Sequence, residues 1–384
     1  MEITLEAGDL SAAIGRVKGV APSRQTIPII NNLLLSTGNG SVAITATNMD
    51  MQSETSVVCE VISPGVITIP AHVAFGIAKA LPKTKLLTIK IENDRARVTC
   101  GKSKYDLRTL PAHDFPLVNA SVEGAVRFDM SAAVLRSSID AVKGLFDANH
   151  PQPFYKGLWM IAEGDALAFV AADGKRLARV RVEGGAPSGM SAIQIGQDAV
   201  REIASLLAGS DGIVSLEATK ERLSIDAGGV GFTTRLMAGA LAPYGKLFEA
   251  SAGGPTATVN AGALVDALDR LMVVYGSSDT KSPCVTLAGR SGEIEISAGS
   301  RGADYGRELV DAEFSEAFDF STSAPLFAEA AKLWPSTATL AISARPGMGA
   351  LITSLDAPHQ SQIIMPMTPP SAFRGADQDQ SEAA

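Results

Sequence analysis

Short strand patterns, each followed at once by a helical pattern, recur along the whole chain. Six triplets with two apolar residues around a central one begin at residues 3, 67, 128, 193, 257 and 318. Alternation of this kind predicts a half-buried strand. Successive triplets begin 64, 61, 65, 64 and 61 residues apart. Such regular spacing predicts six copies of one structural unit.

A helical spacing of apolar residues follows each triplet. In the first unit Leu10, Ile14 and Val17 recur at i, i+4 and i+7, which predicts a helix over residues 10–20. The corresponding helices are predicted at residues 71–85, 130–146, 197–208, 261–274 and 324–334. Each carries one apolar stripe, so each is expected to pack on a sheet with one face.

The remainder of each unit alternates again and is interrupted by turn residues. Residues 33–35 and 42–45 flank the turn Gly38-Asn39-Gly40, which is typical of a hairpin. Similar hairpins are predicted at residues 87–98, 158–171, 214–225, 285–296 and 340–353. Each unit is therefore a strand, a helix and several antiparallel strands, and the fold class is α+β.

The size of the unit predicts how the units combine. About 60 residues bury too little surface to be stable alone, whereas pairs of units have ordinary domain size. Three similar domains are predicted, at residues 1–122, 123–250 and 251–368. Residues 369–384 are rich in Pro, Ala, Asp and Gln, and we expect a disordered tail there.

Composition excludes several classes of protein. The 384 residues include 33 basic and 41 acidic side chains, a net charge of −8, so charge alone cannot provide affinity for nucleic acid. The chain contains neither an apolar run of membrane-spanning length nor the pattern of a signal peptide. Three widely spaced cysteines, Cys59, Cys100 and Cys284, are typical of the reducing cytoplasm.

Five local motifs, together with the sixfold spacing, resemble the bacterial sliding clamp family, the beta subunits of DNA polymerase III. They lie at residues 27–35, 44–50, 109–116, 172–178 and 363–367. The resemblance implies a DNA clamp fold of three similar domains that dimerises head to tail into a ring around duplex DNA. It also implies a non-catalytic, cytoplasmic and nucleoid-associated protein without a cofactor or a metal.

Simple geometry agrees that two chains are needed for such a ring. Six helices packed about 8–10 Å apart leave an opening under about 10 Å, which is too narrow for a duplex with a major groove of about 12 Å. Twelve helices leave about 25 Å, which admits DNA and a water layer. The predicted helices hold ten basic and six acidic residues, which suits a weakly attractive lining.

The resemblance further implies a cleft that binds short apolar peptides of partner proteins. The expected partners are the polymerase III alpha subunit, the clamp loader and other proteins with a clamp-binding motif. Its walls would be Tyr155, Gly174, Lys175, Arg176, Leu177, Leu247, Ile363, Met365, Pro366 and Met367. Methionines suit such a groove because their side chains adapt to different ligands. Lys175 and Ala172 depart from the usual histidine and hydroxyl residue of the family, which affects the expected partner preference.

The remaining sites implied by the resemblance concern DNA and the second copy of the chain. Arg24, Lys79, Lys83, Gln152 and Phe154 are expected to contact DNA. Tyr105, Leu107, Val273 and Val274 are expected at the dimer interface.

Enzymatic patterns are weak in this sequence. Its four histidines lack a ligand-like spacing, and it has neither a G-x-S-x-G elbow nor a P-loop. Two alternatives to a working clamp are kept: a divergent clamp with altered or lost partner binding, and a repeat-built hydrolase or ligand-binding protein.

Overall fold

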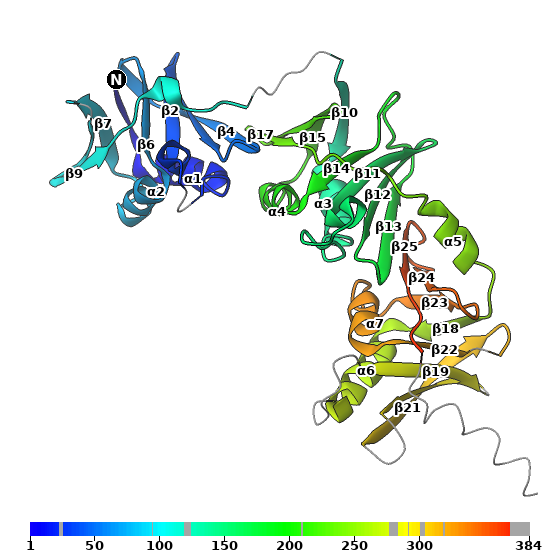
Figure 1. The fold of residues 1–384 in the computed structure, drawn as a ribbon. Helices are drawn as coiled ribbons and strands as arrows, with labels where there is room; N and C mark the ends of the chain where they lie inside the picture. The colour runs from blue at the N-terminus through cyan, green and yellow to red at the C-terminus, as the bar shows by residue number, and fades with distance from the viewer. Residues whose placement is uncertain are drawn as a thin grey trace, which may run out of the picture. The chain divides into compact units, whose positions relative to one another are not determined.

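The computed structural model describes residues 1–22, 26–93, 95–118, 124–208, 210–275, 283–290, 292–299, 304–317 and 319–368 (Figure 1). Contacts divide the chain into two units. The first comprises Met1–Asp140 and Gly185–Ala238, and the second comprises Ala141–Gly184 and the chain from Gly239 onward. The three predicted domains are a different division, and their boundaries stay a prediction.

The first unit holds two antiparallel sheets. One has the strand order β5-β1-β7-β8-β9 and the other the order β10-β15-β16-β17-β4-β3-β2-β6. The strands of these sheets are β1 (Glu2–Glu6), β2 (Asn32–Gly38), β3 (Ser41–Thr47), β4 (Met51–Val58), β5 (Glu60–Ser63), β6 (Val66–Pro70), β7 (Leu86–Glu92), β8 (Arg95–Cys100), β9 (Ser103–Arg108), β10 (Val126–Ser131), β15 (Ile213–Ala218), β16 (Arg222–Ala227) and β17 (Val230–Arg235). Strand β14 (Ile193–Gly196) lies in the same stretch of chain but in neither of these two sheets. The helices are α1 (Ala7–Val17), α2 (Ala71–Ala80), α3 (Ala132–Asp140) and α4 (Gln197–Leu206).

The second unit is built on one continuous antiparallel arrangement, β11-β12-β13-β25-β24-β23-β18-β21-β20-β19-β22. Its strands are β11 (Gly157–Glu163), β12 (Ala166–Ala172), β13 (Arg176–Val182), β18 (Thr256–Asn260), β19 (Cys284–Arg290), β20 (Glu293–Gly299), β21 (Tyr305–Phe314), β22 (Asp319–Ser323), β23 (Thr339–Ser343), β24 (Ala350–Ser354) and β25 (Gln360–Ile364). Its helices are α5 (Gly245–Ser251), α6 (Ala261–Tyr275) and α7 (Ala324–Ala331).

The sixfold strand–helix repeat is present in the structure. Helices α1, α2, α3, α4, α6 and α7 each begin at the residue after a strand, namely β1, β6, β10, β14, β18 and β22. Five predicted triplets lie inside those strands. Phe318, the first residue of the sixth, lies outside the described residues. The six predicted hairpins are also observed, from β2–β3 to β23–β24.

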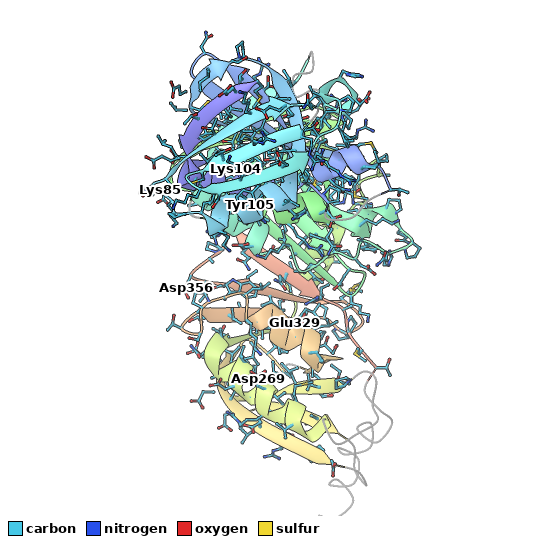
Figure 2. The ribbon with its side chains drawn as sticks, turned by 90° about the vertical axis from the view of Figure 1, so that its left-hand side faces the viewer. Lys85, Lys104, Tyr105, Asp269, Glu329 and Asp356 are labelled. Carbon is cyan, nitrogen blue, oxygen red and sulfur yellow. The ribbon has the colours of Figure 1, made fainter. Side chains whose placement is uncertain are left out.

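The apolar stripes of the helices form the cores as predicted, except in α2. There Ala71, Ala74 and Ala78 form the buried face, whereas the larger Val73 is 51% exposed. Leu10, Ile14 and Val17 of α1 are buried, and α1 lies beside α2 (Figure 1). In the second unit α6 and α7 lie side by side, and Phe327 of α7 is fully buried among the strands. Asp269 of α6 and Glu329 of α7 are on the opposite, exposed side of this helix pair (Figure 2).

Several helices end earlier than predicted. Helix α2 ends at Ala80, and Leu81 is already extended because Pro82 follows it. Lys83 therefore lies beyond the helix, although the helix predicted over residues 71–85 included it. Helix α3 ends at Asp140, and α7 ends at Ala331, although Trp334 beyond it is still buried.

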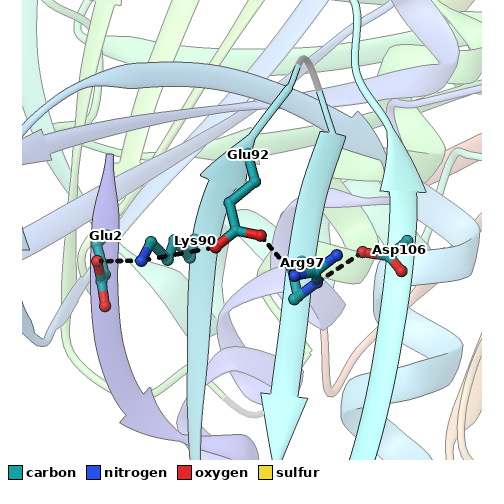
Figure 3. Close-up of polar contacts among 5 residues, drawn as sticks. All are labelled: Glu2, Lys90, Glu92, Arg97 and Asp106. Carbon is teal, nitrogen blue, oxygen red and sulfur yellow. Dashed lines mark hydrogen bonds and ion pairs between the residues drawn. The ribbon is translucent and has the colours of Figure 1, made fainter.

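The exposed face of the five-stranded sheet carries a chain of ion pairs across four strands. Lys90 contacts Glu2 and Glu92, while Arg97 contacts Glu92 and Asp106 at 2.5 and 2.9 Å (Figure 3). Asp106 belongs to the edge strand β9, so the alternating residues Tyr105 and Leu107 face the other side. Leu107 is buried there and Tyr105 is half-buried.

Candidate functional site

An apolar cavity of about 350 Å³ lies within the second unit. Four separate stretches of chain form it: residues 154–155 before β11, the end of β12 with the turn and start of β13, the region of α5, and the end of β25. The lining residues are Phe154, Tyr155, Ala172, Gly174, Arg176, Leu177, Ala242, Pro243, Tyr244, Lys246, Leu247, Ile363 and Met365. Such a volume and such a lining are typical of a site for an apolar ligand.

The turn before β13 forms one wall and is held by Asp173. Its Oδ1 accepts hydrogen bonds from the backbone N–H groups of Lys175 (2.9 Å) and Arg176 (2.7 Å). Gly174 has a φ of +83°, a left-handed conformation that favours glycine. The Asp-Gly sequence therefore places residues 174–177 along the cavity.

Arg176 is the charged group of this wall, and its side chain is 8% exposed. Its Nε and one terminal nitrogen contact Asp173 Oδ2 at 3.1 and 3.0 Å. The other terminal nitrogen donates to Glu329 Oε2 at 2.7 Å. The carboxylates of Asp173 and Glu329 thus compensate the burial of the Arg176 guanidinium, so the positive charge in the cavity wall is paired.

Aromatic side chains form the cavity wall at residues 154–159. Phe154 stacks on Trp159 with 5.8 Å between ring centroids, and Trp159 donates its Nε1–H to the Phe154 carbonyl at 3.0 Å. Tyr155 packs edge-on against both Phe154 and His150. This packing fixes the rings, so the cavity is formed without a ligand.

Most of the predicted cleft residues line this cavity. Tyr155, Gly174, Arg176, Leu177, Leu247, Ile363 and Met365 are among the lining residues. Lys175, Pro366 and Met367 are their neighbours in the chain but are not among them. Sequence reasoning missed Pro243, Tyr244 and Lys246, although Pro243-Tyr244 is a visible aromatic-proline turn just before α5.

The residues predicted to contact DNA have different environments. Lys79, Lys83 and Gln152 are exposed, and Arg24 lies outside the described residues. Phe154 is only 9% exposed and lines the apolar cavity. Stacking on Trp159 holds its ring inward, so we reassign Phe154 from the DNA contacts to the cavity wall.

The predicted interface residues are divided between surface and core. Val273 on α6 is 76% exposed, so its side chain is available to a partner. Leu107 is 7% exposed and belongs to the core of its own unit. The side chain of Val274 lies outside the described residues.

Within the described residues, no helix is both long and apolar enough to cross a membrane.

Two family models match the chain. The DNA polymerase III beta subunit N-terminal domain matches residues 1–119, and its central domain matches residues 129–242. The beta sliding clamp of Pseudomonas aeruginosa is 28% identical over 318 residues, which cover 82% of this chain and 85% of that protein.

Solved structures agree over nearly the whole chain. The sliding clamp of Bartonella birtlesii bound to griselimycin has a TM-score of 0.87 and 26% identity, covering 96% of this chain and 100% of that one. The DNA polymerase III subunit beta of Pseudomonas aeruginosa has a TM-score of 0.89 and 25% identity, with the same coverage.

The repeated strand–helix units and their antiparallel sheets therefore define a DNA clamp fold of the α+β class. The chain belongs to the DNA polymerase III beta subunit family, the beta sliding clamps. This family serves DNA replication and is non-catalytic, so the hydrolase alternative is excluded.

Proposed function

We propose that this chain is a processivity factor that encircles duplex DNA as a homodimer of three-domain subunits. It would tether the polymerase III alpha subunit, the clamp loader and repair proteins through the apolar cavity. The observation that carries the proposal is the gathering of apolar walls from four stretches of the chain into one preformed cavity. A divergent clamp that had lost its partners would have no reason to keep that cavity.

The rim of the cavity supports a peptide ligand. Leu247 is 44% exposed and Met365 is 41% exposed, so two large apolar side chains remain available at the surface. Lys246 lies in the lining beside them. Apolar anchors with a cation at the edge suit a short peptide that inserts apolar side chains.

Two strand edges support the proposed dimer. Strand β9 is the last strand of its sheet, and residues 305–311 of β21 pair only with β20 within the described part of the chain. The exposed charged side chains of β9 are Lys104, Asp106 and Arg108, and those of residues 305–311 of β21 are Arg307 and Asp311. Both edges carry both signs of charge, so strand addition between β9 of one copy and β21 of another would allow opposite charges to pair.

Contacts with DNA are proposed for the exposed Lys79, Lys83 and Gln152, together with Arg24. A chain with a net charge of −8 cannot hold DNA by attraction alone, so closure of the ring would provide retention. Weak contacts with phosphates would then position the duplex without stopping it from sliding.

Loading the protein onto nicked circular DNA with its native clamp loader tests the ring. We expect the protein to stay bound to the circle and to be lost once the circle is linearised. Equal retention on both forms would contradict encirclement.

Stimulation of the replicative polymerase on a long primed template tests the cavity. Met365→Asp should abolish stimulation, because a charge would enter the apolar rim. Leu355→Asp is the matched control, since Leu355 is also apolar, 68% exposed and in the same unit but outside the cavity. No stimulation by the unsubstituted protein would favour the divergent clamp.

A further inference from the structure

Arg176 takes part in both the cavity and a distant helix. Its guanidinium lines the cavity, and one nitrogen reaches Glu329 on α7, 153 residues further along the chain. Glu329 is not among the lining residues, and its side chain is 62% exposed. A residue outside the cavity therefore holds a side chain of the cavity wall.

Strand β22, which precedes α7, holds the part of the cavity wall that contains Met365. The Thr322 hydroxyl of β22 donates to the Met365 carbonyl at 3.0 Å, and the Met367 N–H donates to the Ser321 carbonyl at 2.8 Å. Thr322 is fully buried. One strand–helix unit, β22–α7, thus contacts both Arg176 and Met365, the charged and the methionine parts of the cavity.

We propose that Glu329 is a positioning residue for peptide binding, which acts by holding the Arg176 guanidinium in the cavity wall. The inference rests on the proposed function of the cavity as a peptide site. Through this contact, helix α7 contributes to the affinity of the cavity for a peptide.

The geometry of a guanidinium explains the effect. Arg176 contacts Asp173 along one edge and Glu329 along another, so its plane is fixed in both directions. Without Glu329, the Arg176 side chain keeps only Asp173 of these two partners and gains rotational freedom. Peptide binding must then pay the entropy of fixing the guanidinium again. Because Glu329 is largely exposed, the contribution is moderate.

Peptide affinity of Glu329→Gln measures the contribution. The probe is a short fluorescein-labelled apolar peptide ending in leucine and phenylalanine, titrated with the full chain and followed by fluorescence anisotropy. We expect binding about two- to fivefold weaker than for the unsubstituted protein, the range for an exposed ion pair. The difference should shrink at about 0.5 M salt, where exposed charges are screened.

The matched control is Asp269→Asn. It removes the ion pair between Lys332, the residue that follows α7, and Asp269 on α6, at 2.9 Å, and neither residue lines the cavity. We expect unchanged peptide affinity and a similar small change in melting temperature for both variants. Equal weakening by Asp269→Asn would attribute the effect to general loosening of α7 and overturn the proposal.

A double variant tests whether Glu329 acts through Arg176. In an Arg176→Lys background, Glu329→Gln should weaken binding little further, because the fixed guanidinium is already lost. A full additional loss, or unchanged affinity of Glu329→Gln alone, would refute the positioning role. If the unsubstituted protein binds no peptide, the proposed function fails instead, so the two failures are distinguishable.

Discussion

The hydroxyl of Tyr244 donates a hydrogen bond to the carboxylate of Glu163, 81 residues earlier in the chain. The Tyr244 ring lines the apolar cavity, so the bond anchors a wall from behind. Glu163 also lies 3.4 Å from Arg181 Nε and 3.7 Å from a terminal nitrogen of Arg179. One carboxylate on β11 therefore joins the aromatic wall to Arg179 and Arg181 of β13.

This hydrogen bond predicts a pH-dependent stability. Burial, followed by the bond to Glu163, raises the pKa of Tyr244 above its usual value, while Arg179 and Arg181 oppose the shift. The folded state thus favours the protonated hydroxyl, and its contribution is complete below about pH 10, where tyrosine titrates in the unfolded chain. Above that pH the contribution is progressively lost.

Tyr244→Phe should therefore be less stable than the unsubstituted protein by about 1–2 kcal/mol at pH 8, because Glu163 loses its donor. Urea denaturation at pH 8 and at pH 11 checks this. The difference between the two proteins should narrow at the higher pH. A constant difference would show that the hydroxyl does not titrate as the buried environment requires.

A half-buried carboxyl group, that of Glu202, lies in the first unit beside Gly19, just beyond the end of α1. Burial raises the pKa of Glu202 on α4, although Lys18 partly opposes the shift. The charged carboxylate is therefore disfavoured in the folded state at neutral pH. Contacts there are close, since a Cβ on Gly19 would collide with this carboxylate.

Glu202→Gln should raise the melting temperature by about 1–3 °C at pH 7. A carboxyl group whose pKa is raised on folding stabilises the protein at pH values below its pKa in the unfolded chain. This contribution is lost as the pH rises through its pKa in the folded protein. The advantage of the variant should accordingly disappear near pH 4, where the unsubstituted carboxyl is also protonated. Calorimetry at the two pH values checks both parts, and an equal advantage at pH 4 would contradict the role of the charge.

The sequence predicts the repeat well because strand and helix periodicities are local. Residues 3–5 and 10–17 already show both periods of the first unit, and the structure has β1 and α1 there. Local context also explains where prediction fails. Pro82 ends α2 earlier than its apolar stripe suggests, and α5 is too short to show a clear period.

Long-range contacts are invisible to periodicity. Phe154 follows an exposed loop in the sequence, yet its ring is buried on Trp159, so its place in the cavity could not be read from its neighbours. The Arg176–Glu329 contact joins residues of two different strand–helix units. The pairing of β13 with β25 brings those units together.

Thiol reactivity gives a test of burial in the second unit. Burial raises the pKa of Cys284 to about 11, and the side chain is 5% exposed. Since the thiolate is the reactive form, Cys284 should react with a disulfide reagent at pH 8 at least about a hundredfold more slowly than in the unfolded chain. A variant with Cys59→Ser and Cys100→Ser isolates this thiol. Fast reaction without denaturant would contradict the buried environment of β19.

The exposed valine of α6 tests the dimer. Val273→Glu places a charge on a side chain that is 76% exposed, so the folded subunit should tolerate it. If a second copy covers Val273, the charge would be buried without a partner, and we expect monomers in sedimentation experiments and loss of retention on circular DNA. Leu355→Glu is the control, because Leu355 is equally apolar and exposed but lies on the loop between β24 and β25. A Val273→Glu protein that sediments as a dimer would remove Val273 from the interface, while leaving strand pairing between β9 and β21 to be tested separately.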